Sequence, residues 1–180
     1  MAKVKIHDKE FEIFIPYEKI RSVVEKMAEQ MNRDLKDKNP LFLCILNGSF
    51  MFAADLLKNL EFACEIQFVK VSSYHGTQSS GKIQQVLGLS QPVKGRRLVI
   101  IEDIIDSGLT IDFLQKQLAL AEPKSMSICS LLVKPKALKV ALEIAYTGFE
   151  VENEFLVGYG LDYDGLGRNL RHLYQVDKQD

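Results

Sequence analysis

The most constraining feature of this sequence is an apolar run that ends in two carboxylates. Leu98 to Ile101 is purely aliphatic, and Glu102 and Asp103 follow it directly. A short run without polar residues is typical of a strand that is covered on both faces, as in a parallel sheet. Charged groups at the end of a buried strand are costly unless they have partners, so the two carboxylates predict a polar binding site at this point.

Further apolar runs alternate with helical repeats along the chain. The patterns predict strands over residues 11–15, 41–46, 66–73, 83–89 and 126–133, and helices over residues 17–36, 50–58 and 111–121. Strands that alternate with helices indicate an α/β fold with a mostly parallel, twisted sheet that is flanked by helices. In such sheets ligands bind beyond the carboxyl ends of the strands. We therefore expect the functional residues in the segments that follow the strands.

The residues that open the predicted helix after the acidic pair suit a bound anion. They are Asp106, Ser107, Gly108, Leu109 and Thr110. Backbone N–H groups and the positive end of a helix dipole attract a phosphate, hydroxyl groups can donate to it, and a glycine lets the backbone come close. Carboxylates cannot hold the phosphate itself, but they suit sugar hydroxyls or a hydrated magnesium ion. The segment predicts a phosphate cradle beside an acidic site.

Simpler interpretations exist for each of these residues. Asp106 could only cap the helix, and Glu102 and Asp103 could be a solvated strand end. A flavodoxin-like signalling domain would use the acidic pair as a metal pocket, but this does not explain residues 106–110 or the later Asp162. The sequence has neither a GxxxxGK[ST] phosphate loop nor a GxGxxG fingerprint, which disfavours kinase-like and dinucleotide-binding proteins.

The complete string over residues 98–110 closely resembles the 5-phosphoribosyl diphosphate motif of the type I phosphoribosyltransferases. Its form, Glu-Asp-Ile-Ile-Asp-Ser-Gly, is similar to that of the hypoxanthine-guanine phosphoribosyltransferases, and the resemblance extends from about residue 11 to 171. It implies that Glu102 and Asp103 hold the ribose hydroxyls and the associated magnesium. Asp106 would be the general base for purine N7, and Ser107 to Thr110 would bind the 5'-phosphate. The implied reaction transfers the 5-phosphoribosyl group to N9 of hypoxanthine or guanine.

Two further loops match the family in order along the chain. The resemblance implies that Asn47 and Gly48 belong to the diphosphate loop, whose backbone amides bind the leaving group. Many family members carry Lys or Arg in the place of Asn47. The asparagine side chain has no charge, so a charged contribution at this position is absent here. Ser73 and Tyr74 begin a polar segment that resembles the flexible loop of the family, which closes over the reacting centre. An ordinary hairpin tip is the simpler interpretation of that segment.

The resemblance also implies a purine site. Lys134 would donate to the O6 atom of the purine, which selects 6-oxopurines over adenine because an ammonium group cannot accept from an amino group. Phe155 would stack on the base, and the backbone of Leu156 would read its edge. Asp162 would help to bind the purine and ligate a second magnesium ion, and Arg168 would reach the diphosphate. Without the resemblance, a lysine at a strand end is solvated and the apolar run is a core strand.

Length and family resemblance together predict the organisation of the chain. Its 180 residues fit one domain. The resemblance implies a core over about residues 16–150 and a small hood made from about residues 1–15 and 151–180. Family members are commonly dimers or tetramers, so we expect a homodimer or homotetramer.

Charge and cysteine content limit the other possible functions. The net charge is −1, from 23 basic and 24 acidic residues, which gives little support to an RNA-binding regulatory protein that retained the motif. A xanthine-preferring enzyme is the closer alternative, because Lys134 does not settle the 2-position of the base. The three cysteines are widely spaced, no apolar signal core is present, and no apolar run near the start is long enough to span a membrane. We therefore expect a cytoplasmic enzyme whose partners are 5-phosphoribosyl diphosphate and 6-oxopurine bases, without nucleic acid or membrane.

Overall fold

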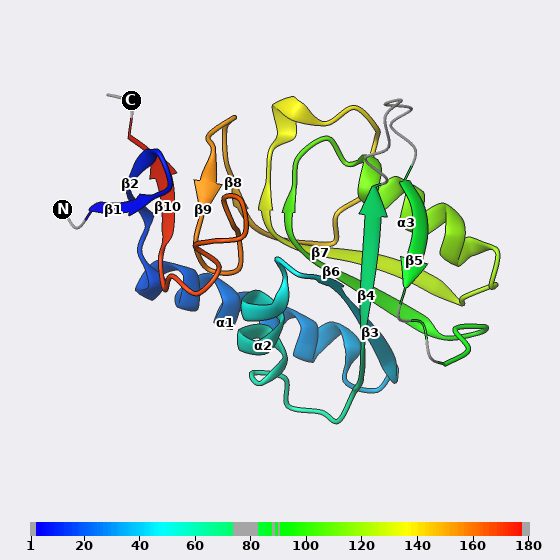
Figure 1. Ribbon diagram of the computed structural model, residues 1–180. Coiled ribbons are helices and arrows are strands. Elements are labelled where there is room, and N and C mark those ends of the chain that lie inside the picture. Colours follow the sequence, from blue (N-terminus) through cyan, green and yellow to red (C-terminus); the bar gives the residue numbers. More distant parts are fainter. Residues whose placement is uncertain (1–2, 74–82, 88, 90, 178–180) are drawn as a thin grey trace.

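The protein consists of two β-sheets joined by a long helix. The computed structural model describes residues 3–73, 83–87, 89 and 91–177. Within these residues, a six-stranded sheet has the order β5-β4-β3-β6-β7-β8, and a four-stranded sheet has the order β1-β2-β10-β9 (Figure 1). The second sheet combines the two ends of the chain.

The six-stranded sheet is parallel except at one edge. Its strands are β3 (Pro40–Leu46), β4 (Glu65–Ser73), β5 (Ile83–Leu87), β6 (Arg97–Ile105), β7 (Ser125–Val133) and β8 (Tyr146–Glu150). Neighbouring strands run parallel, apart from β4 and β5, which form an antiparallel pair. The fold class predicted from the sequence, a mostly parallel sheet flanked by helices, is therefore confirmed.

Both faces of the central strands are buried, which explains their continuous apolar sequences. On β3, Phe42 and Cys44 pack with α1 (Tyr17–Leu35) and α2 (Phe50–Leu57). Leu41 and Leu43 point to the other face and pack with α3 (Leu109–Ala119). Successive side chains of a strand alternate between faces, so a strand with helices on both sides needs an apolar residue at every position.

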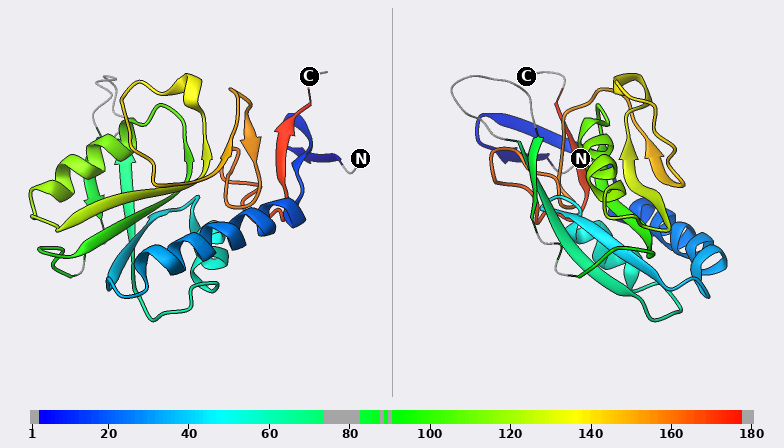
Figure 2. Two further views of the ribbon diagram at one scale, coloured as in Figure 1. Left: turned by 180° about the vertical axis from the view of Figure 1, so that it is seen from behind. Right: turned by 90° about the vertical axis from the view of Figure 1, so that its right-hand side faces the viewer.

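Helix α1 connects the two sheets. It runs from the smaller sheet to the far end of the larger one, as Figure 2 shows from behind. Ile20 and Met31, near its two ends, are both fully buried in one hydrophobic cluster that also contains residues of the C-terminal segment. The two sheets therefore share a core.

We call the smaller, antiparallel sheet the hood sheet. It contains β1 (Lys3–Ile6), β2 (Lys9–Ile15), β9 (Leu156–Val157) and β10 (Leu173–Val176). Strand β10 lies between β2 and β9 and hydrogen-bonds to both, so the two ends of the chain are held in one ladder.

The structure differs from the sequence prediction in two respects. Strand β6 continues to Ile105, so Glu102 and Asp103 lie inside the strand and not after its end. The short strands β1, β8 and β10 and the 3-10 helix Pro135–Ala137 were not predicted. No helix in the described part of the chain is long and apolar enough to cross a membrane.

Candidate active site

The acidic pair of β6 is buried at the carboxyl end of the sheet. Glu102 is 8% exposed and Asp103 is 7% exposed. Burial raises the pKa of Glu102 well above its usual range, and the hydrogen bond to Asp103 and the negative charge of that residue raise it further. The two carboxylates repel each other when both are charged. A bound cation or several hydroxyl donors would offset this repulsion, so the pair is suited to such ligands.

A cavity of about 210 Å³ opens beside the acidic pair. Its lining comes from Ile45 of β3, the end of β6, the turn that follows β6 and the first turn of α3 (Ile45, Glu102, Asp103, Ile104, Ile105, Asp106, Ser107, Gly108, Thr110 and Ile111). Leu109 begins α3 and is not part of this lining. The N–H groups in the first turn of α3 have no carbonyl partner within the helix, and this turn lines the cavity, so the cavity combines an anion cradle with two carboxylates.

Lys134 and Asp106 form an ion pair at this site. The Lys134 ammonium nitrogen lies 2.9 Å from Oδ2 of Asp106, to which it donates a hydrogen bond. The Lys134 side chain is 11% exposed, whereas that of Asp106 is 56% exposed. The backbone N–H of Lys134 also donates to the carbonyl oxygen of Ile105, which fixes the end of β7 against the end of β6. A cationic donor and an anionic acceptor are thus held side by side.

The predicted diphosphate loop lies directly against the acidic pair. Gly48 is buried, and a Cβ atom at this position would overlap the carboxylate of Asp103. The carbonyl oxygen of Gly48 in turn lies against Gly160, where a Cβ atom would overlap it. Gly160 has a φ of +105°, which favours glycine. Asp103, Gly48 and Gly160 therefore form a stack of close contacts that leaves no room for side chains.

Asp162 and Arg168 form a second ion pair, next to this stack. The Arg168 guanidinium lies 2.6 Å from Oδ1 of Asp162 and also donates to the carbonyl oxygen of Gly160, at 2.8 Å. The other Asp162 oxygen accepts from the backbone N–H of Gly165 at 2.8 Å. Asn47 is exposed at the start of the loop. An arginine fork held in this way matches the geometry of phosphate oxygens.

Phe155 presents an aromatic ring at the edge of the hood sheet. Its side chain is 47% exposed, and its ring lies edge-on to Tyr163, with centroids 5.4 Å apart. Leu156, by contrast, is buried in β9 and pairs with Gln175 of β10. The ring is therefore held by its neighbours while part of it stays accessible.

The acidic residues fit a metal that is bound partly through its substrate. In residues 3–73, 83–87, 89 and 91–177, no three acidic, histidine or cysteine side chains converge to form a metal site. Glu102 and Asp103 lie together, but Asp162 is engaged with Arg168. Magnesium commonly binds to one or two carboxylates and completes its shell with water and substrate phosphates, so this donor set suits magnesium.

The structure also reveals site residues that the sequence did not suggest. Tyr159 is fully buried, and its hydroxyl donates to Oδ2 of Asp55 at 2.6 Å. His172 accepts at Nδ1 from the N–H of Tyr17, at the first residue of α1. Because these contacts join residues more than a hundred positions apart, no local pattern predicts them. Ser73 ends β4, and Tyr74 lies outside the described residues.

Comparison with known proteins adds independent evidence. Residues 16–164 match the family model described as "Phosphoribosyl transferase domain". The chain is 40% identical over 162 residues to the hypoxanthine-guanine phosphoribosyltransferase of Streptococcus pneumoniae, covering 89% of this chain and 90% of that one. It is 35% identical over 172 residues to the enzyme of the same name from Mycobacterium bovis, covering 92% and 85%. A hypoxanthine-guanine phosphoribosyltransferase crystal structure from Bacillus anthracis superposes with a TM-score of 0.83 at 36% identity, covering 92% of this chain and 98% of that one.

The raised pKa of Glu102 predicts a pH-dependent stability of the metal-free protein. A carboxyl whose pKa is higher in the folded than in the unfolded state destabilises the fold as the pH rises from about 4.3 through the folded-state pKa. We expect Glu102→Gln to stabilise the protein at pH 8 by about 1–3 kcal/mol and to have a much smaller effect at pH 4. Urea unfolding in EDTA at both pH values measures this, with the exposed Glu143→Gln as the control. A Glu102→Gln protein that is less stable than the wild type at pH 8 would contradict the prediction.

The stack of close contacts predicts a large effect for one added methyl group. Gly160→Ala places a Cβ atom on the carbonyl of Gly48 and forces alanine into a φ of +105°, so we expect a loss of about 2 kcal/mol or more. Gly165→Ala is the matched control, because its φ is +86° but no atom lies within 4 Å of the added carbon. It should cost only about 1 kcal/mol. Thermal and urea unfolding compare the two variants, and equal losses would count against the close contact.

Proposed function

The chain belongs to the phosphoribosyl transferase domain family, and from this premise we propose that it is a hypoxanthine-guanine phosphoribosyltransferase of purine salvage. The enzyme transfers the 5-phosphoribosyl group from 5-phosphoribosyl diphosphate to N9 of hypoxanthine or guanine, and it gives IMP or GMP and diphosphate. The observation that carries this proposal is the ion pair of Lys134 and Asp106 beside the cavity at the end of β6.

This pair fits one edge of a 6-oxopurine. The O6 and N7 atoms are neighbours on that edge, so Lys134 can donate to O6 while Asp106 accepts the proton of N7. Removal of that proton makes the base a better nucleophile. As N9 forms its bond to the C1' atom of the ribose, the bond from C1' to the diphosphate oxygen breaks, and its electron pair leaves with the diphosphate. Binding of the purine would replace the ion pair. Lys134 would donate to O6 in place of Asp106, and Asp106 would accept from N7 in place of Lys134.

The cavity lining provides for the sugar phosphate. The N–H groups at the start of α3 and the hydroxyls of Ser107 and Thr110 would bind the 5'-phosphate, with Gly108 and Leu109 in the same turn. Glu102 and Asp103 would bind the ribose hydroxyls. Loss of diphosphate builds positive charge on the ribose ring, and two carboxylates beside the ring stabilise that charge.

The remaining predicted residues surround the base and the leaving group. Phe155 would stack on the purine with its accessible face, and the backbone of Leu156 would read the edge of the base. The backbone N–H groups of Asn47 and Gly48 would bind the diphosphate, and Arg168 would add a guanidinium to it. Because position 47 carries no charge, the cationic contribution falls to Arg168. Ser73 and Tyr74 would belong to a loop that closes over the reacting centre and excludes water.

Magnesium is the proposed cofactor. Glu102 and Asp103 would hold one ion, and Asp162 would hold a second ion or a water molecule on it, in agreement with a donor set made only of oxygen atoms. When bound, magnesium neutralises the charge that develops on the departing diphosphate.

The reaction assay tests the proposed function. Purified protein with 5-phosphoribosyl diphosphate and magnesium should form nucleotide from hypoxanthine or guanine, and not from adenine, as followed by absorbance.

Asp106→Asn should lower kcat by about 10²- to 10⁴-fold with little change in the binding of 5-phosphoribosyl diphosphate. Lys134→Ala, as the counterpart variant, should reduce the preference for oxopurines over adenine. Turnover with xanthine alone would favour the xanthine enzyme, and bound 5-phosphoribosyl diphosphate without any turnover would favour the RNA-binding regulatory protein.

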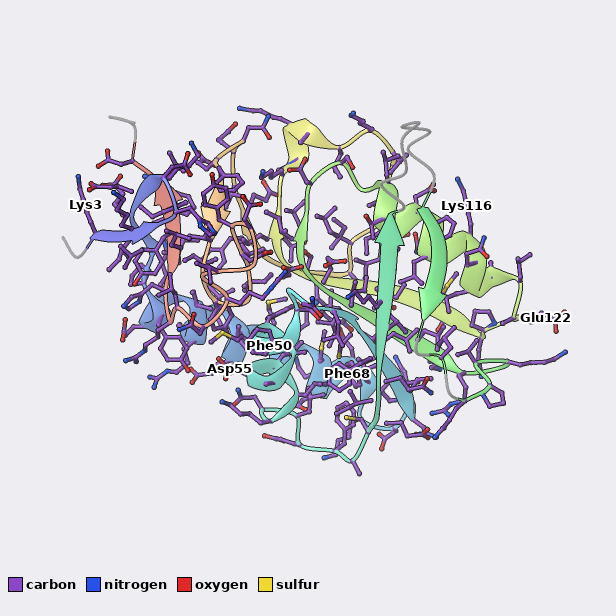
Figure 3. All side chains as sticks on the ribbon, viewed as in Figure 1. Lys3, Phe50, Asp55, Phe68, Lys116 and Glu122 are labelled. Atoms are coloured by element: carbon purple, nitrogen blue, oxygen red, sulfur yellow. The ribbon has the colours of Figure 1, made fainter. Side chains whose placement is uncertain are left out.

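We further propose that the enzyme is a cytoplasmic homodimer or homotetramer. Phe50, Ile66 and Phe68 are 41%, 43% and 50% exposed. Ile66 and Phe68 pair with Phe42 and Cys44, so they lie on the sheet face that α2 covers, and Figure 3 shows Phe50 on that helix and Phe68 on β4. Exposed large apolar side chains of this kind suit a second copy of the chain. The proposed cytoplasmic location has separate support. The free cysteines suit a reducing compartment. Recovery of the protein in the cytosolic fraction of cells checks the location.

This apolar face predicts a change of mass in solution. Phe68→Ser should shift the protein from an oligomer to the monomer of 20.4 kDa in sedimentation velocity, because a hydroxyl replaces a large apolar contact. Leu120→Ser is the control, since Leu120 is 79% exposed at the end of α3, on the opposite face of the sheet. A monomeric wild-type protein, or an oligomer that Phe68→Ser leaves intact, would contradict the proposed interface.

A further inference from the structure

A buried tyrosine ties the predicted diphosphate loop to the C-terminal loop of the site. Tyr159 is the largest of the fully buried side chains in the described residues, and its hydroxyl donates to Oδ2 of Asp55 at 2.6 Å. Asp55 lies on α2, the helix that starts directly after the diphosphate loop (Figure 3). Tyr159 lies in the loop that carries Asp162 and Arg168. The hydrogen bond therefore spans the two segments proposed to hold the diphosphate.

The backbone of Tyr159 is held in an uncommon conformation. Its φ is +47°, and its neighbours Gly158 and Gly160 have φ values of +92° and +105°. A tyrosine in the left-handed region costs free energy, so it persists only where the surroundings fix it. Here the N–H of Tyr159 donates to Leu170 at 2.7 Å, and the N–H of Gly160 donates to Arg168 at 3.0 Å. The backbone of Tyr159 is thus held by the carbonyl oxygen of Leu170, and the other end of the residue is held by the hydrogen bond of its hydroxyl to Asp55.

Asp55 is itself held in place by several neighbours. Lys58 donates to its Oδ1 atom at 2.5 Å, and the hydroxyl of Tyr17 approaches Oδ2 at 3.5 Å. The ring of Tyr17 also lies 6.1 Å from that of Tyr159. Because burial raises the pKa of Tyr159, and the hydrogen bond to Asp55 raises it further, the phenol stays protonated and keeps its donor. Asp55 is therefore held in place as the acceptor on α2, and Tyr159 remains the donor because its hydroxyl does not ionise.

The residue after Tyr159 transmits this anchor to the site. Gly160 lies on the carbonyl oxygen of Gly48, and its own carbonyl accepts from Arg168 at 2.8 Å. A displacement of Tyr159 would therefore move Gly160 away from the diphosphate loop and move the guanidinium of Arg168 with it. The hydroxyl of Tyr159 is buried and donates to Asp55, so its role is to position other residues.

We propose that the hydrogen bond between Tyr159 and Asp55 positions the residues that bind the diphosphate. It sets the distance between the loop of Asn47 and Gly48 and the C-terminal loop that carries Asp162 and Arg168. This inference rests on the proposed function, because it assumes that the two segments bind one diphosphate group. It predicts that loss of the bond weakens ligands that carry diphosphate and spares ligands that lack it.

The test compares two ligands on one variant. Tyr159→Phe removes only the hydroxyl, so its dissociation constant for 5-phosphoribosyl diphosphate should rise about tenfold, while that for IMP should change less than about twofold. Isothermal titration calorimetry of the full-length protein with magnesium measures both constants. Tyr146→Phe is the matched control, because Tyr146 is another buried tyrosine whose hydroxyl donates to an aspartate, Asp34, at 3.1 Å on another part of the sheet.

A second pair of variants tests the acceptor of the hydrogen bond. Asp55→Asn keeps an oxygen that accepts from Tyr159, so it should bind 5-phosphoribosyl diphosphate within about threefold of the wild type, whereas Asp55→Leu should resemble Tyr159→Phe. Equal losses for 5-phosphoribosyl diphosphate and IMP, or unchanged affinity for both in Tyr159→Phe, would overturn the inference. The readout is binding, so a wild-type protein that binds 5-phosphoribosyl diphosphate without turnover refutes the proposed function alone. A wild-type protein that binds neither ligand refutes both.

Discussion

The close packing of the Asp103 carboxylate on Gly48 is the contact on which the rest of the site depends. It brings a charged side chain of β6 against the loop that follows β3, and Gly160 closes over the other side of that loop. Three segments from distant parts of the sequence therefore meet at one point, where Gly48 leaves room for the Asp103 carboxylate and Gly160 leaves room for the carbonyl oxygen of Gly48. A carboxylate in such a place has little access to water, so the fold accepts an electrostatic cost there, as functional sites commonly do.

This cost is tolerated because the surrounding structure is tightly packed. The strand that carries the acidic pair is covered by helices on both faces, and α1 joins the larger sheet to the hood sheet in one core. The two ends of the chain pair in the hood sheet, so the C-terminal loop cannot move without disturbing β2. The positions of Gly160 and Arg168 are thus set by packing far from the cavity.

The sequence was informative where one segment contains all the determinants of its structure. Residues 98–110 combine the apolar run, the carboxylates and the helix start, so a strand followed by a helix could be predicted from them, and the alternation of strands and helices along the chain predicted the sheet type. The short strands β1, β8 and β10 could not, because a four- or five-residue strand is specified mainly by its partner. The pairing of Tyr159 with Asp55 was inaccessible for the same reason, since the two residues are 104 positions apart. Strand β6 also extends past its acidic pair, because the ladder with β7 continues to Ile105 and Val133.

The charged residues of the site are arranged in three pairs, two of opposite charge and one of like charge. Lys134 with Asp106 and Arg168 with Asp162 are opposite charges, so each pair supports itself until a ligand replaces one partner. Glu102 with Asp103 is a pair of like groups, and its repulsion is relieved by a proton or by a bound cation. The first two pairs therefore hold their own side chains in position at little electrostatic cost. The acidic pair lies against the loop of Gly48, which Gly160 covers on its other side, and its repulsion is the electrostatic cost that a bound cation would remove.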